Sequence, residues 1–157
     1  MTLPQTIIDD LGFTVEGDWV KDIAEMHTKF GVNPVIRKLD KDHLRMFLKF
    51  RIDFLMEELT ELSDEFDNNL NHTAAERADN TVDALIDLCV VAIGTLNAFD
   101  VDSYEAWARV REANMAKSSG VNASRPNPLG LPDMIKPAGW SAPTHNDNVG
   151  LFAKVFD

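Results

Sequence analysis

The chain has 157 residues, of which 45% are apolar, and its 15 basic and 26 acidic residues give a net charge of −11. This length and composition indicate one globular domain over residues 1–157 with a substantial core. The acidic balance argues against a basic surface for nucleic acid or for an anionic membrane. It still permits an anionic small substrate if a divalent metal screens the acidic site.

The N-terminus and the cysteine content predict a cytoplasmic protein. The start Met-Thr-Leu-Pro-Gln lacks the basic and apolar regions of a signal peptide. No uninterrupted apolar stretch reaches the roughly 18 residues of a membrane-spanning helix. Cys89 is the single cysteine and lies in an apolar run, which predicts a buried thiol in a reducing compartment.

Four helices are predicted over residues 18–117, where glycine and proline are rare. The first runs from about Asp18 to Phe30, because Asp18 suits an N-cap and Gly31 suits a stop. Residues 31–38 contain a proline and are expected to form a connection.

The second helix is predicted to begin near Asp40 or Asp42 and to run to about Asn68, since an acidic start suits the helix dipole. Apolar residues follow one of its faces at helical spacing: Leu44, Leu48, Leu55, Leu59, Leu62 and Phe66. Further apolar residues lie off this stripe: Phe50, Ile52 and Met56. This is more apolar surface than one bundle face needs, so we expect an oligomer.

Capping signals define the remaining helices. Thr73 with Glu76 has the capping-box pattern and starts a helix that runs to about Phe99. Asp102 or Ser103 caps the fourth helix, which is expected to end near residue 117.

The segment from about 120 to 157 contains five prolines and is predicted to be a non-helical tail. Trp140 and Phe152 give this tail apolar side chains with which to dock, so we expect it to pack on the helical core of about residues 18–117.

Asp87 lies within the apolar run of residues 84–93, with Asp83 one helical turn before it. Burying an unpaired carboxylate is costly, so a cation is expected to meet Asp87. The preceding helix carries a matching acidic cluster: Glu57, Glu58 and Glu61. Antiparallel packing across the short turn between the helices would bring the two acidic faces together. Oxygen ligands favour Mg²⁺ or Mn²⁺ over zinc or copper.

The sequence allows two other interpretations of these acids. The glutamates could form a solvated helix face, with Asp83 paired to Arg51 or Arg77. A di-iron carboxylate bundle would need Glu-x-x-His pairs on two helices, and no histidine of the chain has a glutamate three residues before it.

The order of these motifs resembles a known family. Glu57-Glu58-x-x-Glu61, followed by Asn80-x-x-Asp83 and Asp87, resembles the all-α nucleoside triphosphate pyrophosphohydrolases, the MazG-like and phosphoribosyl-ATP pyrophosphohydrolase-like proteins. The likeness continues in segments between about residues 18 and 145: Ile23 to Gly31, which is similar to small phage-type members, Ala92 to Asp102, Glu112 to Lys117, and Lys136 to Trp140.

The resemblance implies an all-α, four-helix bundle-type fold with a proline-rich non-helical tail. It implies Mg²⁺- or Mn²⁺-dependent hydrolysis of a (deoxy)nucleoside triphosphate to the monophosphate and pyrophosphate, for control of the nucleotide pool. It also implies a homodimer or homotetramer, acting in the host cytoplasm if the chain is phage-encoded. The base is not readable from the sequence, and dGTP, dATP, dUTP, dCTP or a phosphoribosyl nucleotide are all candidates.

The resemblance also implies roles for individual residues. The metal ligands carry over to Glu58, Glu61 and Asp83, with Asp87 and Glu57 as further candidates. A glutamate that is not fully used as a ligand, Glu57 or Glu61, would take a proton from the attacking water.

Four polar residues are expected at the substrate: Arg51, Asn80, Asn114 and Lys117. Without the resemblance, Asn114 and Lys117 would be interpreted as ordinary residues of a helix end. Many members of the family carry glutamate where this chain has Asn80. The amide can coordinate through its oxygen, or the ligand role can pass to Asp79 or Asp87.

Aromatic residues near the first helix are candidates either for stacking on a base or for core and dimer contacts: Phe13, Trp19, His27 and Phe30. Two hypotheses of other classes stay open. The chain could be a non-catalytic helical scaffold, or a nucleotide-binding relative that has lost activity through the change at Asn80.

Overall fold

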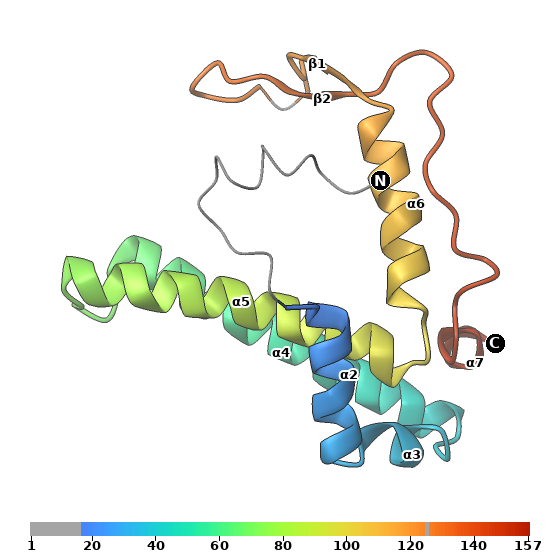
Figure 1. Cartoon of the computed structure of the whole chain (residues 1–157). Helices are drawn as coiled ribbons and strands as arrows, with labels where there is room; N and C mark the ends of the chain where they lie inside the picture. Colours follow the sequence, from blue (N-terminus) through green and yellow to red (C-terminus); the bar gives the residue numbers. More distant parts are fainter. Residues whose placement is uncertain (1–16, 125) are drawn as a thin grey trace.

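The computed structural model describes residues 17–124 and 126–157, and within them the protein is all-α apart from one small strand pair (Figure 1). The helices and strands in chain order are α2 (Trp19–Lys29), α3 (Val32–Ile36), α4 (Lys41–Asp67), α5 (Ala74–Ala98), α6 (Ser103–Met115), β1 (Ser118–Gly120), β2 (Asp133–Ile135) and α7 (Phe152–Phe156). The all-α class predicted from the sequence is confirmed. The predicted Phe13 lies outside the described residues.

Side chains cap the four long helices at the positions that the sequence predicts. Asp18, Asp40 and Asp102 each accept a hydrogen bond from a backbone N–H in the first turn of α2, α4 and α6. Thr73 and Glu76 form a reciprocal capping box at the start of α5. Each cap satisfies an N–H that has no partner within its helix, which fixes where the helix begins.

The connection predicted between the first two long helices is itself partly helical. Residues 32–36 form α3, and the proline in it is Pro34. Proline is tolerated in the first turn of a helix, because the N–H that it lacks would have no partner there in any case. The prediction of a plain connection was therefore wrong at this point.

The centre of the fold is an antiparallel hairpin made by α4 and α5, and α2 packs across α5 (Figure 1). The core lies at one end of this hairpin, where Leu44 at the start of α4 and Phe99 just after α5 are fully buried. Ile36 from α3 and Val155 from α7 complete this core. We call this the closed end of the hairpin.

The tail returns to the closed end and is not entirely non-helical. It pairs β1 with β2 in antiparallel register and ends in α7. The ring of Phe152 stacks on that of Phe99 with centroids 4.2 Å apart. The prediction of a wholly non-helical tail was wrong for residues 152–156, because the prolines stop at Pro143 and the last turn has a core against which to pack.

A glycine permits this return of the tail. Gly150 has φ of +50°, and a Cβ there would lie 2.0 Å from the carbonyl oxygen of Phe99. The next residue, Leu151, donates its N–H to that same oxygen at 2.7 Å. Only a residue without a side chain fits both the backbone conformation and the close approach.

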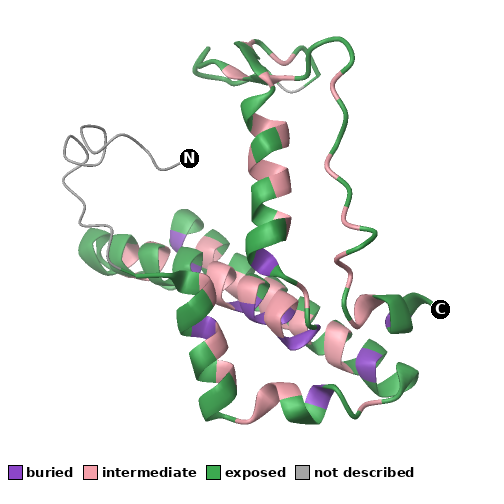
Figure 2. Ribbon diagram, turned by 45° about the vertical axis from the view of Figure 1, so that its right-hand side comes forward, coloured by how far each residue is buried: buried purple, intermediate pink, exposed green. Residues whose placement is uncertain are grey.

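The other end of the hairpin comprises the second half of α4 and the first half of α5, and no other described element covers it (Figures 1 and 2). We call it the open end. The predicted apolar stripe of α4 is therefore buried only at its start: Leu44 is 0% exposed, whereas Leu59 is 49% and Phe66 is 80% exposed. Helix α6 instead projects away from the hairpin and carries the strand pair at its far end (Figure 1).

By length and mean hydropathy, α5 is able to cross a membrane, with an 18-residue window of hydropathy 1.6. The expectation that no stretch qualifies was wrong on this measure, because it counted only uninterrupted apolar runs. In the structure α5 packs against α4 and α2. Only 28% of the window is buried, since the open end is bare, and Cys89 is half-buried rather than buried.

Candidate active site at the open end of the hairpin

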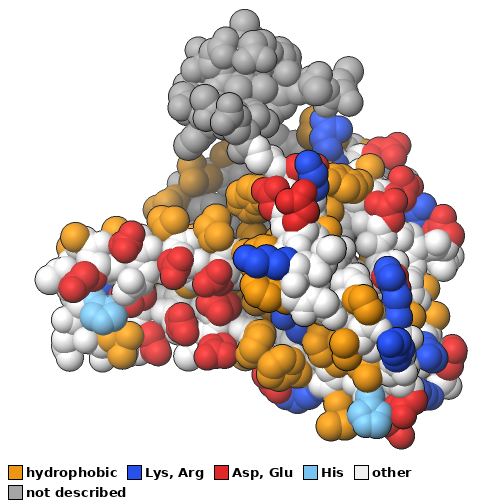
Figure 3. All heavy atoms as spheres, turned by 60° about the horizontal axis from the view of Figure 1, so that its bottom comes forward, with side chains coloured by type: hydrophobic (Ala, Val, Ile, Leu, Met, Phe, Trp, Pro, Cys, Tyr) orange, Lys and Arg blue, Asp and Glu red, His pale blue; other side chains and the backbone are white. Residues whose placement is uncertain are grey.

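The acidic residues predicted from the sequence face one another across α4 and α5. The pKa of Glu58 is raised, first by partial burial and then by four neighbouring negative charges, those of Glu61, Asp87, Glu57 and Asp83. Acidic side chains from both helices gather on this face of the open end (Figure 3). The structure therefore brings together the five carboxylates of the predicted site.

The same carboxylates are not closed around one point. No group of three or more His, Cys, Asp or Glu side chains in the described residues is arranged so that it could hold a metal ion as it stands. Glu57, Glu61 and Asp83 are exposed, while Glu58 and Asp87 are half-buried. Like charges on neighbouring helices repel, so carboxylates of this kind draw together only around a cation.

A small pocket of about 330 Å³ opens between the two helices and the turn that joins them. Glu61 and Asp83 of the predicted site line it together with Asn80. The remaining lining residues are Asp64, Glu65, Leu70 and His72. All the charged groups from α4 and α5 in this pocket are carboxylates, and oxygen donors of this kind fit a hard cation such as Mg²⁺ or Mn²⁺.

Glu65 is a member of this site that the sequence analysis missed. The residue is only 4% exposed, and its Oε1 accepts hydrogen bonds of 2.7 Å from Asn80 Nδ2 and from His72 Nδ1. The signal was present in the spacing, because Glu65 follows Glu61 by one helical turn and Glu58 by two. Asn80, predicted at the substrate, thus binds a carboxylate of the opposite helix.

Arg51, also predicted at the substrate, lies in the contact between α4 and α5. Its Nε donates to Thr95 Oγ1 at 3.0 Å and its Nη2 donates to the Val91 carbonyl at 2.9 Å. A Cβ on Gly94 would lie 3.1 Å from Nη2, so the glycine leaves room for the guanidinium. Burial lowers the pKa of Arg51. The structure gives Arg51 a role in joining the helices, and its binding of substrate stays a prediction.

The alternative in which an arginine neutralises Asp83 has no support in the contacts of either candidate. Arg51 is bound to α5 as described, and Arg77 donates to the carbonyls of Glu65 and Phe66 at 2.7 and 2.8 Å. These bonds tie the start of α5 to the end of α4. Both guanidinium groups are thus held by acceptors other than Asp83.

Asn114 and Lys117 lie at the end of α6 that points away from the hairpin (Figure 1). Lys117 Nζ donates to Asn114 Oδ1 at 2.8 Å and lies 5.3 Å from the centre of the Trp140 ring. Lys136 lies 4.7 Å from the same ring. Within one chain these residues form a basic and aromatic cluster that is separate from the carboxylates.

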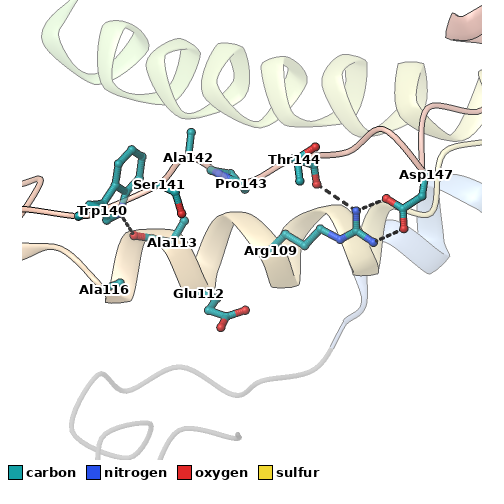
Figure 4. A pocket seen from close by; sticks show the side chains of 11 residues that line it. Arg109, Glu112, Ala113, Ala116, Trp140, Ser141, Ala142, Pro143, Thr144 and Asp147 are labelled. Atoms are coloured by element: carbon teal, nitrogen blue, oxygen red, sulfur yellow. Dashed lines mark hydrogen bonds and ion pairs between the residues drawn. The ribbon is translucent and has the colours of Figure 1, made fainter.

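Trp140 fixes the tail on α6, since its indole N–H donates to the Ala113 carbonyl at 2.7 Å. A cavity of about 630 Å³ lies between α6 and the tail beside this contact (Figure 4). Arg109 lines the cavity and binds both carboxylate oxygens of Asp147, whose pKa this pairing lowers to about 2. The positive charge of Arg109 is therefore already neutralised by Asp147.

Among the aromatic candidates near α2, His27 makes a contact within the chain, whereas Trp19 and Phe30 are exposed. Trp19 is 53% exposed and Phe30 is 72% exposed, so neither belongs to the core of the single chain. His27 is half-buried, and its Nδ1 lies 2.8 Å from Asn97 Oδ1, which links α2 to α5. His27 thus makes a structural contact, while the exposed pair stays available for base stacking or for a second subunit.

Comparison with known families agrees with this geometry. The chain belongs to the MazG-like nucleoside triphosphate pyrophosphohydrolase superfamily. The facing carboxylates of its α4–α5 hairpin agree with this assignment. Within that superfamily, the model of the phosphoribosyl-ATP pyrophosphohydrolase family matches residues 37–114. This range includes all of α4 and α5 and all of α6 except its last residue. The match indicates a pyrophosphohydrolase that acts on nucleotide substrates. No curated protein matches the chain.

Proposed function

We propose that the protein hydrolyses a (deoxy)nucleoside triphosphate to the monophosphate and pyrophosphate with Mg²⁺ or Mn²⁺, and so controls a nucleotide pool. The proposal depends on one observation: Glu58 lies close to four other carboxylates on α4 and α5. A water-soluble scaffold gains nothing from five mutually repelling groups, whereas a site for a cation and a triphosphate requires them.

The donor set fits a hard divalent cation, although it is not closed around one. Glu58, Glu61, Asp83 and Asp87 would hold the ion through carboxylate oxygens. A bound Mg²⁺ or Mn²⁺ would screen the phosphate charges and lower the pKa of a water molecule. Family members typically depend on a divalent metal.

The protein's own residues would move the proton. Glu57 and Glu61 are exposed at the edge of the acidic face, where a carboxylate can accept a proton from the attacking water. The water oxygen forms a bond to phosphorus, the bond from that phosphorus to the leaving pyrophosphate oxygen breaks, and the proton passes to the carboxylate. The site lacks a glycine-rich phosphate loop, so side chains and metal would carry the phosphate charge.

We also propose that the active form is a homodimer or homotetramer. Large apolar side chains on α4 are exposed in the single chain: Met46, Phe50, Ile52, Met56 and Leu59. Exposed apolar surface of this extent on one helix is typical of an interface. A second copy would cover this surface of α4 and would allow Asn114 and Lys117 of one subunit to approach the carboxylates of another. The cytoplasmic location is proposed from the sequence alone.

The test is pyrophosphate release from a panel of ribo- and deoxyribonucleoside triphosphates with Mg²⁺ or Mn²⁺. Glu58→Gln removes one charge at nearly constant shape, and we expect it to lower the rate by at least about a hundredfold. Glu25→Gln, at an exposed glutamate of α2 that pairs with Lys21 at 3.8 Å, is the matched control and is expected to leave the rate unchanged.

Three results would contradict the proposal. A folded wild-type protein that releases no pyrophosphate from any nucleotide would favour the scaffold hypothesis. Nucleotide binding without turnover would favour the relative that has lost activity. Release that does not require Glu58 would place the chemistry elsewhere in the protein.

A further inference from the structure

Glu65 carries a buried carboxylate oxygen that has no hydrogen-bond partner. Its side chain is 5% exposed, and while Oε1 accepts two hydrogen bonds, Oε2 accepts none within the described residues. Leaving a charged oxygen buried and unpaired costs several times more free energy than a lost surface hydrogen bond. Glu65 lines the pocket between α4 and α5 together with Glu61 and Asp83. A cation in that pocket would supply the missing partner.

The groups around Glu65 hold it in place without neutralising it fully. Asn80 Nδ2 reaches Oε1 from α5, and His72 Nδ1 reaches the same oxygen from the turn between the helices, both at 2.7 Å. Two donors on one oxygen fix the orientation of the carboxylate and leave the other oxygen free to coordinate. A residue that only joined α4 to α5 would need the acceptor at Oε1 and would not need a charge, as glutamine would serve equally well.

Asn80 stands at the α5 position where the family resemblance leads us to expect a carboxylate. Its amide donates to Glu65, so this chain has a carboxylate from α4 beside that position. This hydrogen bond links α5 to α4 and holds the Glu65 carboxylate at the pocket. Glu65 is a different residue from Asp79 and Asp87, the two that the sequence offered in place of a carboxylate at position 80.

We propose that Glu65 is a ligand of a divalent cation in this pocket, together with Glu61 and Asp83, and that Asn80 and His72 are its positioning residues. The inference rests on the proposed function for the choice of Mg²⁺ or Mn²⁺ and extends its ligand set. In this proposal Asn80 orients the ligand Glu65 and is not itself a ligand.

The test measures Mn²⁺ binding to the full chain without nucleotide, from the loss of the electron paramagnetic resonance signal of free Mn²⁺. Glu65→Gln keeps an acceptor for Asn80 and His72 and removes the charge, so the fold is expected to persist. We expect this variant to bind Mn²⁺ at least about tenfold more weakly and to lose the rise in Tm that Mn²⁺ gives the wild type. Asp67→Asn makes the same change of charge at an exposed residue two positions away that does not line the pocket, and it is expected to bind as the wild type does.

A second variant tests the exchange of carboxylates directly. Adding Asn80→Glu to Glu65→Gln returns a carboxylate to the pocket from the opposite helix, and we expect it to restore most of the Mn²⁺ affinity. Unchanged Mn²⁺ binding in a folded Glu65→Gln variant would overturn the role of Glu65 while leaving the proposed hydrolase intact. Wild-type protein that binds no Mn²⁺ and releases no pyrophosphate would overturn both proposals, and release without Mn²⁺ binding would overturn only the pocket.

Discussion

The two ends of the α4–α5 hairpin differ in what covers them and in what their side chains are. At the closed end, Leu44 and Phe99 are fully buried under α3 and α7. At the open end, Phe66 is 80% and Val82 is 61% exposed, and the carboxylates face one another. The same pair of helices therefore carries the core at one end and the candidate chemistry at the other.

This division explains how the chain tolerates five carboxylates on one face. Burial of aromatic and aliphatic groups at the closed end stabilises the fold and offsets the repulsion between the carboxylates at the open end. Arg51 binds the α5 backbone and a side chain of α5, so it joins the two helices. Changes at the closed end should alter the free energy of unfolding, and changes at the open end should alter metal binding and turnover.

The largest expected effect is the loss of the central aromatic ring at the closed end. Phe99→Ala removes a fully buried side chain that stacks on Phe152 and Phe47, and it should lower the free energy of unfolding by roughly 3–5 kcal/mol. Val82→Ala, at an exposed residue of the open end, should cost about 1 kcal/mol or less. Urea unfolding of both variants at one protein concentration makes the comparison, and equal losses would remove the distinction between the ends.

Next in size is the return of the tail to the closed end. Gly150→Ala would place a Cβ 2.0 Å from the Phe99 carbonyl oxygen, and we expect a loss of about 2–3 kcal/mol with release of α7. Gly130→Ala is the matched control, since Gly130 also has a positive φ, of +68°, but its Cβ would meet nothing within 4 Å. The control should cost only about 1 kcal/mol, which is the backbone strain alone. Hydrogen exchange of residues 151–156 reports the release, and equal protection in both variants would refute the close approach.

A smaller effect is expected at Arg51, which joins α4 to α5. Arg51→Lys keeps the charge but cannot reach both the Thr95 hydroxyl and the Val91 carbonyl, so the free energy of unfolding should fall by about 1–2 kcal/mol. Mn²⁺ affinity and the KM for nucleotide should stay unchanged if Arg51 only joins the helices. A raised KM with unchanged stability would instead support the substrate role that the sequence predicts for Arg51.

The smallest effect concerns the arm formed by α6 and the tail, and it depends on pH. Arg109 lowers the pKa of Asp147 from its ordinary value to about 2. A lowered folded-state pKa stabilises the protein above the unfolded value, and this contribution is lost as the pH falls through about 2. Asp147→Asn should therefore lower Tm at pH 7, and the difference from wild type should vanish near pH 2. A difference in Tm that is independent of pH would show that the carboxylate charge plays no part.

Much of the helical structure followed from local signals. Asp18, Asp40 and Asp102 cap α2, α4 and α6 as their positions predict, and Thr73 with Glu76 forms the capping box at α5. These signals act within one turn of the chain, so they are readable without knowledge of the fold. The helix α3 was missed because proline in a first turn is easily interpreted as a break.

The candidate site was predictable in part for the same reason. Glu57, Glu58 and Glu61 share one helix face by their spacing, and the short turn makes α5 return antiparallel, so their approach to Asp83 and Asp87 follows from periodicity. The hydrogen bond of Arg51 to a backbone carbonyl of α5 was not predictable, because it depends on how closely the helices pack at Gly94. The separation of Lys117 from the carboxylates depends on the angle at which α6 leaves the core.

The sequence by itself determined the all-α class, the limits of the long helices and the acidic faces of α4 and α5, because caps and helical periodicity are local properties. Only the tertiary structure decided which end of the hairpin is covered, that Glu65 is buried beside Asn80 and His72, and that the tail ends in α7 against Phe99. Those outcomes depend on contacts between residues far apart in the chain, where burial and hydrogen bonding are settled by packing and not by spacing.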